Sequence, residues 1–167
     1  DITQQKQWEL TLIAQEKHFR QIFEEASIAM ALVDKDFHFT QINRAFENYL
    51  GYNEKELENK TFADITVDRF IEENRKHLLK LINGEISMYR TEKQYKRKDK
   101  TIVWGLVQVS AMHDQNGAFT SQLVMINDIN DRKAAEESLL KSEEIFNQFM
   151  LNSPIYVFFK DNQIRSH

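Results

Sequence analysis

The chain repeats its own opening phrase, and this repeat constrains its organisation more than any other feature. It begins DITQQKQWEL, and the stretch from Asp128 reads DINDRKAAEE. When Asp1 is placed on Asp128, identical residues continue without a gap through a helical stretch and past both of its ends. The other identical pairs are Ile2 and Ile129, Lys6 and Lys133, Glu9 and Glu136, Leu12 and Leu139, Glu16 and Glu143, Phe19 and Phe146, Gln21 and Gln148, Ile28 and Ile155, and Asp34 and Asp161. Chance similarity between two amphipathic helices is the alternative, but the extent of the match favours one period of a tandem array followed by the start of the next unit.

Residues 3–25 predict a helix with a coiled-coil stripe, and Thr3 can cap its start. Spacings of four and three alternate along it, which is the a/d rhythm of a heptad. The stripe consists of Trp8, Leu12, Gln15, Phe19 and Ile22, and the second copy keeps it with Ala135, Leu139, Ser142, Phe146 and Phe149. This pattern favours a dimer seam. Two heptads also fit a single helix that packs its stripe on its own domain.

Between the two helices the pattern is that of an α+β domain. Residues 27–34 and 37–43 predict a β-hairpin, and residues 87–96, 101–113 and 118–127 predict three more strands, the last two joined by the turn DQNG. Asn43 can cap a short helix that stops at Gly51, and a longer helix should fill residues 68–83. Helices against one face of an antiparallel sheet are expected. Residues 101–113 are apolar on both alternations, so the second face also needs a cover, from the flanking helix or a partner subunit.

The order of these elements, the phrase NRAFENYLGYNEKEL, the strand KTIVWGLVQVS, the turn DQNG and the exit DINDRK together resemble a PAS domain with its C-terminal PAC segment. The resemblance covers residues 19–133. It implies a five-stranded antiparallel sheet with helices on one face, flanked by N- and C-terminal amphipathic linker helices. Residues 1–18 would then be a linker helix after a preceding PAS domain, 134–150 a second linker helix, and 151–167 the truncated start of a following PAS domain.

The family implies a sensory module of a tandem-PAS bacterial signalling protein, forming a homodimer through its linker helices. It would control an effector elsewhere in the same chain, either a histidine kinase or a diguanylate cyclase or phosphodiesterase. The signal would leave where the last strand gives way to a helix, and a plain helix cap is the alternative for that junction. Asn130 stands where the family usually has Thr, a departure that keeps capping ability. The residues of this exit are Asp128, Ile129, Asn130, Asp131 and Arg132.

The same resemblance implies a ligand pocket between the helices and the concave face of the sheet. The absence of cysteine excludes a covalent flavin adduct, and His77 is displaced from the axial position of haem-binding relatives. Non-covalent flavin near Trp104 and Asn74, a small metabolite, or no tight ligand stay open, and core packing is the alternative role for Trp104. Face counting gives as pocket residues Met30, Leu32, Phe46, Phe70, Asn74, His77, Leu81, Trp104, Leu106, Met125 and Asn127.

Composition argues against several other functions. The net charge of -4 disfavours a nucleic-acid partner, and the basic run KQYKRKDK at residues 93–100 is expected to be a solvated hairpin turn. No apolar run is long enough to span a bilayer, so no membrane contact by these residues is expected. The lack of cysteine suits the cytoplasm. We expect no metal site and no catalytic site here, while a constitutive dimerisation scaffold or a small α+β enzyme remain alternative functions.

Overall fold

The structure is a computed structural model, and it describes residues 1–152. The chain divides into two compact units, residues 1–130 and a second unit that begins at Asp131. The expected start of a following domain at residues 151–167 lies outside the described residues, apart from its first two positions. In chain order the elements are α1 (Ile2–Glu25), β1 (Ala29–Asp34), β2 (Phe39–Ile42), α2 (Arg44–Leu50), α3 (Glu54–Leu57), the 3-10 helix η1 (Asp68–Phe70), α4 (Ile71–Ile82), β3 (Met88–Lys96), β4 (Ile102–His113), β5 (Phe119–Asp128) and α5 (Asn130–Asn152).

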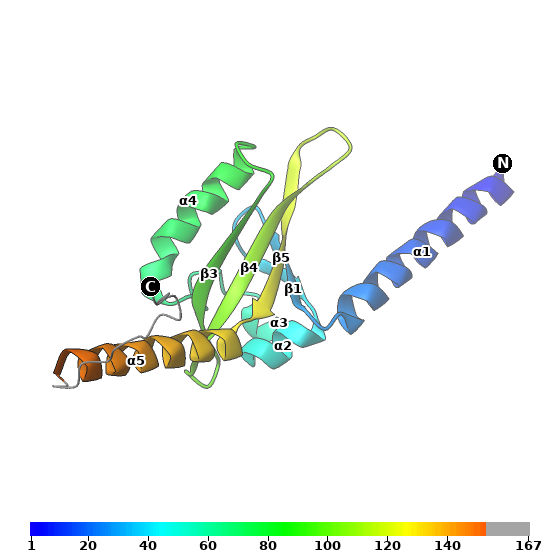
Figure 1. Cartoon of the computed structure of the whole chain (residues 1–167). Coiled ribbons are helices and arrows are strands. Elements are labelled where there is room, and N and C mark those ends of the chain that lie inside the picture. The colour runs from blue at the N-terminus through cyan, green and yellow to red at the C-terminus, as the bar shows by residue number, and fades with distance from the viewer. Residues whose placement is uncertain (153–167) are drawn as a thin grey trace, which may run out of the picture. The chain divides into compact units, whose positions relative to one another are not determined.

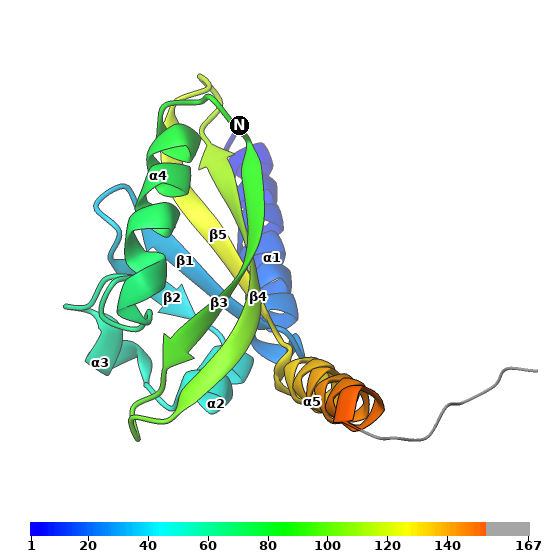
Figure 2. The ribbon, with the colours of Figure 1, turned by 60° about the vertical axis from the view of Figure 1, so that its left-hand side comes forward.

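Five antiparallel strands form one sheet in the order β2-β1-β5-β4-β3. The strands β3, β4 and β5 are neighbours, and the β1–β2 hairpin continues the sheet beyond β5 (Figure 1). In Figure 2, α4 lies across one face of this sheet, with α2 and α3 near its lower end. The predicted α+β fold, with a five-stranded antiparallel sheet and helices at both ends of the chain, is therefore confirmed.

The hydrophobic core lies between these helices and one face of the sheet, here called the inner face. Successive residues of a strand point to opposite faces, so only every second position reaches the core. The other positions form the outer face. Buried residues of the inner face include Ala29, Ala31 and Val33 of β1, Tyr89 and Tyr95 of β3, Val103, Val107 and Val109 of β4, and Ile126 of β5; the helices contribute Phe46, Leu50, Leu57, Leu78 and Leu81.

Asn43 joins three elements at the start of the domain. Its side-chain oxygen accepts hydrogen bonds from the backbone N–H groups of Phe46 at 3.0 Å and Met30 at 2.8 Å, so it caps α2 and binds β1 at once. Its amide group donates to the carbonyls of Phe23 and Ile28, each at 2.9 Å. Because the side chain is fully buried, no water can replace these partners.

Replacing Asn43 with alanine should lower the free energy of unfolding by about 2 kcal/mol, because a helix cap is lost and buried backbone groups are left without partners. Urea unfolding followed by circular dichroism measures the change. Asn53→Ala is the matched control, since Asn53 makes a capping box with Glu56 on the exposed surface. We expect the control to lose less than about 1 kcal/mol. Equal losses would contradict the role given to the buried contacts of Asn43.

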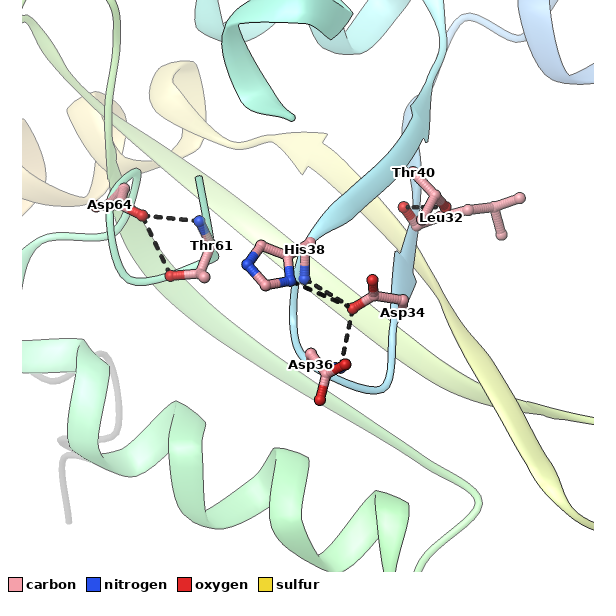
Figure 3. Close-up of polar contacts among 7 residues, drawn as sticks. All are labelled: Leu32, Asp34, Asp36, His38, Thr40, Thr61 and Asp64. Atoms are coloured by element: carbon pink, nitrogen blue, oxygen red, sulfur yellow. Dashed lines mark hydrogen bonds and ion pairs between the residues drawn. The ribbon is translucent and has the colours of Figure 1, made fainter. Parts of the chain in front are cut away.

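The turn between β1 and β2 is organised by Asp34 (Figure 3). Its carboxylate accepts hydrogen bonds from the backbone N–H groups of Asp36 at 2.9 Å and His38 at 3.0 Å. Phe37, between these two residues, has a left-handed φ of 68°, which is uncommon for a residue with a side chain. Its ring meets the ring of Phe62 edge-on, with centroids 5.6 Å apart. The turn thereby brings an aromatic side chain to the helical layer of the domain.

Candidate functional site

A small cavity lies between the inner face of the sheet and the helical layer. Its volume is about 30 Å³. By the volume of a water-sized probe, this is room for about two water molecules. Most of its walls are apolar, and the polar residues Lys93 and Gln122 also line it. Its apolar walls include Phe37, Phe46, Phe62, Leu78, Val109 and Ile126.

This volume decides which of the expected ligands fit. Pockets that hold drug-sized or cofactor-sized molecules usually measure a few hundred Å³ or more. Neither a flavin nor a haem fits a cavity of about 30 Å³. Within residues 1–152 no group of three or more His, Cys, Asp or Glu side chains could hold a metal ion. The chemistry of the interior therefore depends on the few polar side chains that the domain itself buries.

The pocket residues expected on the helical side have different placements. Phe46 lines the cavity, and Leu81 and Asn74 are buried in the layer above the sheet. The side-chain oxygen of Asn74 has no hydrogen-bond partner, while its amide donates to the carbonyl of Phe70 at 2.6 Å. The ring of His77 stacks on that of Tyr89 at 5.0 Å and is partly exposed. Of these five predicted residues, only Phe46 contacts the cavity.

The six pocket residues expected on the strands lie on the outer face, so their assignment to the interior pocket is wrong. The cause is the alternation of side chains, since a shift of one position along a strand exchanges the two faces. In β4 the inner positions belong to Val103, Gly105, Val107 and Val109, while Trp104 packs its ring on Phe70 with centroids 5.9 Å apart. Leu32 lines a separate surface groove beside α1. The six are Met30, Leu32, Trp104, Leu106, Met125 and Asn127.

Lys93 belongs to the interior, so the expectation that the whole run KQYKRKDK is solvated is wrong at its first residue. Its side chain is 4% exposed. The Nζ atom lies 3.3 Å from the hydroxyl of Thr66 and over the rings of Tyr95 at 4.8 Å and Phe62 at 5.8 Å. Burial lowers the pKa of Lys93 from 10.5 to about 7. The signal that could have identified it is the period of two that joins Tyr89, Lys93 and Tyr95 on one face of β3.

The junction after β5 is held by side chains and backbone together. The Asp128 carboxylate accepts hydrogen bonds from the backbone N–H of Asn130 at 2.9 Å and from its side-chain amide at 2.6 Å. The side-chain oxygen of Asn130 accepts from the backbone N–H of Trp104 at 2.8 Å. The carbonyl of Trp104 accepts from the N–H of Ile129 at 3.2 Å and from the hydroxyl of Tyr49 at 2.7 Å. Two of the predicted exit residues, Ile129 and Asn130, thus bind β4 at Trp104, and Asp128 holds Asn130 in place.

The last two predicted exit residues, Asp131 and Arg132, begin the second unit. Arg132 pairs with Glu136 at 3.1 Å, one turn further along α5. Pairs at this spacing stabilise a helix by a few tenths of a kcal/mol. Within the second unit, the pair of Arg132 and Glu136 therefore supports the first turns of the helix.

The predicted seam of α1 is exposed. The exposed fractions are 71% for Trp8, 67% for Leu12, 48% for Phe19 and 57% for Ile22, and Gln15 is exposed as well. Only Phe23 of this helix is buried. The alternative, in which the helix packs its stripe on its own domain, does not agree with this exposure. Among the described residues no helix is long and apolar enough to cross a membrane.

Comparisons with known proteins agree with this architecture. A family model described as "PAS domain" matches residues 27–131. The chain is 35% identical over 122 residues to a protein named probable diguanylate cyclase DgcE of Escherichia coli (strain K12), and the match covers 73% of this chain and 11% of that protein. It is 25% identical over 134 residues to the sensor histidine kinase TmoS of Ectopseudomonas mendocina, covering 80% and 14%.

A solved structure supports the same fold. The crystal structure of a PAS domain from Colwellia psychrerythraea superposes with a TM-score of 0.64 at 16% identity, covering 69% of this chain and 97% of that one. The chain spans 11% and 14% of the two curated relatives, so it corresponds to one part of each of those proteins.

Proposed function

The chain belongs to the PAS domain family, and on this premise we propose that it is the sensory and dimerisation module of a multidomain bacterial signalling protein. The two relatives are named as a diguanylate cyclase and a sensor histidine kinase, and each is much longer than this chain. An effector of one of these two kinds would follow or precede this module in the parent protein. The module would work in the cytoplasm, which the lack of cysteine suits.

The observation that carries this proposal is the network at Trp104. The carbonyl of Trp104 in β4 binds α2 through the hydroxyl of Tyr49. The same carbonyl binds Ile129, and the N–H of Trp104 binds Asn130, so one residue also holds the exit of the domain. A ligand that shifts the helical layer would therefore move the same strand position to which the exit is attached. Such a shared contact is a physical means by which two sites can bias one equilibrium. A plain helix cap would need Asp128 and Asn130 but not the bond from Tyr49.

Dimerisation is the second part of the proposal. The apolar stripe of α1 is exposed in the single chain, and its sequence is repeated after the domain, which suits a signalling helix that runs between tandem units. In a dimer the stripe of one chain would pack on the stripe of the other in coiled-coil fashion. The domain limits proposed from sequence, with linkers at 1–18 and 134–150 around a PAS domain and its PAC segment at 19–133, follow from the same repeat.

One alternative has a specific observation in its favour. A cavity with room for about two water molecules also suits a module that holds no cofactor and relays the movement of its neighbours. Such a relay would still form a dimer and would still use the junction at Trp104. The two versions differ only in whether a small molecule is bound in the interior.

Native mass spectrometry with an absorption spectrum of the purified chain tests the proposal. We expect a dimer without the absorption bands of a flavin or a haem, since neither group fits the cavity. A small mass excess per chain would support ligand sensing, and the mass of the bare dimer would support the relay. A monomer at micromolar concentration, or enzymatic turnover by the chain alone, would contradict the proposed module.

A further inference from the structure

Lys93 is a buried cation without an acidic partner. Among residues 1–152 its only hydrogen-bond partner is the hydroxyl of Thr66, at 3.3 Å. That hydroxyl donates its own proton to the carbonyl of Phe62 at 2.7 Å, so its oxygen can accept one N–H of the ammonium. An ammonium carries three N–H donors. Two of them therefore have no hydrogen-bond acceptor among the described residues, and the rings of Tyr95 and Phe62 lie beside the ammonium.

Such a residue is expensive to bury, because removing a charge from water without a counter-charge is strongly unfavourable. A methionine or leucine at this position of β3 would match the neighbouring apolar walls without that penalty. Strongly perturbed ionisable groups in enclosed sites are more frequent at functional positions than elsewhere. The placement of a lysine here therefore indicates that a further group completes its surroundings in the working protein.

The cavity offers more donors than acceptors. Within the described part of the chain, two other buried polar atoms at its walls lack partners, the hydroxyl of Tyr95 and the amide nitrogen Nε2 of Gln122. Tyr95 is 2% exposed and Gln122 is 1% exposed. An ammonium, a phenol and an amide N–H₂ can all donate hydrogen bonds. In the sheet register Lys93 lies opposite Gly105 and Gln122 opposite Ala111, about 20 Å apart along β4, so one small ligand cannot reach both. A ligand beside Lys93 and Tyr95 must present an acceptor oxygen, and next to the ammonium a negative charge is favoured.

The titratable side chains around Lys93 do not supply this negative charge. The ring of Tyr95, which the Lys93 ammonium overlies, has Tyr89 on β3 and Tyr49 on α2 as titratable neighbours, and His77 on α4 stacks on Tyr89. Burial raises the pKa of each of the three tyrosines, so they remain neutral phenols at physiological pH. His77 stacks on Tyr89 and lies 3.9 Å from the exposed carboxylate of Glu73. No anion among these groups neutralises the ammonium.

We propose that the interior cavity binds a short monocarboxylate ion, of the size of formate or acetate, as the counter-ion of the Lys93 ammonium. This inference rests on the proposed sensory function and names the ligand class of the same interior site. A single positive charge matches a single negative charge, and the apolar walls match a short hydrocarbon part. The volume of about 30 Å³ leaves no room for a longer acid, and a single ammonium leaves a second negative charge without a counter-charge. Binding is non-covalent, since an ion pair and hydrogen bonds hold the ligand.

Acetate titrated into the isotope-labelled chain, followed by nuclear magnetic resonance of the Lys93 side chain and nearby amides, tests the proposal. We expect saturable shifts at about pH 6, where the carboxylate is ionised and the lysine protonated. Because the empty lysine has a pKa of about 7, binding at higher pH must bring a proton with it. The affinity should then fall by about tenfold for each pH unit above 7.

Lys93→Met should remove the acetate response, and Lys96→Met should keep it. Lys96 is the matched control because it lies on the same strand but pairs with Asp68 on the outer side, with its side chain 39% exposed. If Lys93→Met fails to fold, the pH dependence in the unaltered chain decides alone. Saturable binding without that dependence, or unchanged binding in Lys93→Met, would overturn the assignment.

Two further outcomes separate this site from the proposed function. If acetate does not bind while the chain sediments as a dimer, the carboxylate site is wrong and the signalling module stands. If acetaldehyde with borohydride adds mass at Lys93 and acetate has no effect, the lysine acts as a neutral amine toward carbonyl compounds and the anion assignment is overturned. Phosphate and chloride should give no saturable response, because the first carries excess charge and the second has no apolar part.

Discussion

Replacing Leu12 and Phe19 with glutamate should convert a dimer of the chain into a monomer. Both residues are exposed apolar side chains in the stripe of α1, so a seam along it would bury four such side chains per dimer. At about 1 kcal/mol or more for each side chain, the loss reaches about 4 kcal/mol, and dimer affinity falls by about a thousandfold. The new carboxylates would also face each other across the seam. Sedimentation equilibrium measures the effect directly.

The same helix supplies a matched control. Leu10 and Ile13 are exposed at 66% and 60%, but they lie outside the predicted a/d positions. Their replacement by glutamate adds the same charge to the same helix and should leave the dimer intact. An unchanged mass in the Leu12 and Phe19 variant would reject the seam, and equal dissociation by both variants would mean that charge alone separates the chains. Since Phe19 stacks on Phe23 at 5.8 Å, thermal unfolding must accompany each measurement.

The elements of the fold were predictable because their signals are local. Asn43 and Gly51 mark the ends of α2 through a cap and a left-handed φ of 80°, which depend only on nearby backbone. The turn DQNG likewise supplies Gly117 at a φ of 78° between β4 and β5. The predicted strand at residues 101–113 differs from β4 by one residue at its start. Such features are written in a few consecutive residues and need no tertiary context.

The two faces of the sheet could not be told apart in this way. In β4 the alternate sets Val103, Val107 and Trp104, Leu106 are both apolar, and hydrophobic periodicity gives them equal standing. Side-chain size favours Trp104 and Leu106 for the pocket, but the inner positions of β4 hold small residues because aromatic rings from other elements pack against them. Gly105 is the residue that distinguishes the inner face of β4 from the outer face. Its role can be recognised only in the folded chain, where Tyr49 and Tyr95, distant in sequence, pack over it.

Lys93 was misassigned for a related reason. In sequence it opens a basic run, and charged runs are usually solvated. The run is divided by the end of β3, so its first lysine follows the alternation of the strand while its later residues form the turn. A buried lysine is rare enough that charge outweighs periodicity in any reading of a single sequence. In the folded chain periodicity outweighs charge, because Tyr89 and Tyr95 fix the face of β3 on which Lys93 lies.

Gly105→Ala should destabilise the domain by about 3 kcal/mol or more, the upper part of the range for overpacked cores. A Cβ at this position would lie 2.7 Å from Cγ2 of Ile126, 2.8 Å from Cε2 of Tyr95 and 3.0 Å from the hydroxyl of Tyr49. These groups come from β5, β3 and α2, so no single side-chain rotation relieves all three contacts. Displacing Tyr49 would also break its hydrogen bond to the carbonyl of Trp104, to which the exit is attached.

Urea unfolding should show a lower midpoint for Gly105→Ala with an unchanged slope, since the surface exposed on unfolding stays the same. Gly84→Ala is the control, because Gly84 has a left-handed φ of 74° and nothing within 4 Å of an added Cβ. It should lose only about 1 kcal/mol from backbone strain. Similar losses in the two variants would mean that the close contacts around Gly105 relax at little cost, because Gly105 itself has no left-handed φ. A markedly larger loss at Gly105 would instead establish that α2 packs on β4 with no room for an added methyl group. The proposed route from the helical layer to the exit depends on this contact.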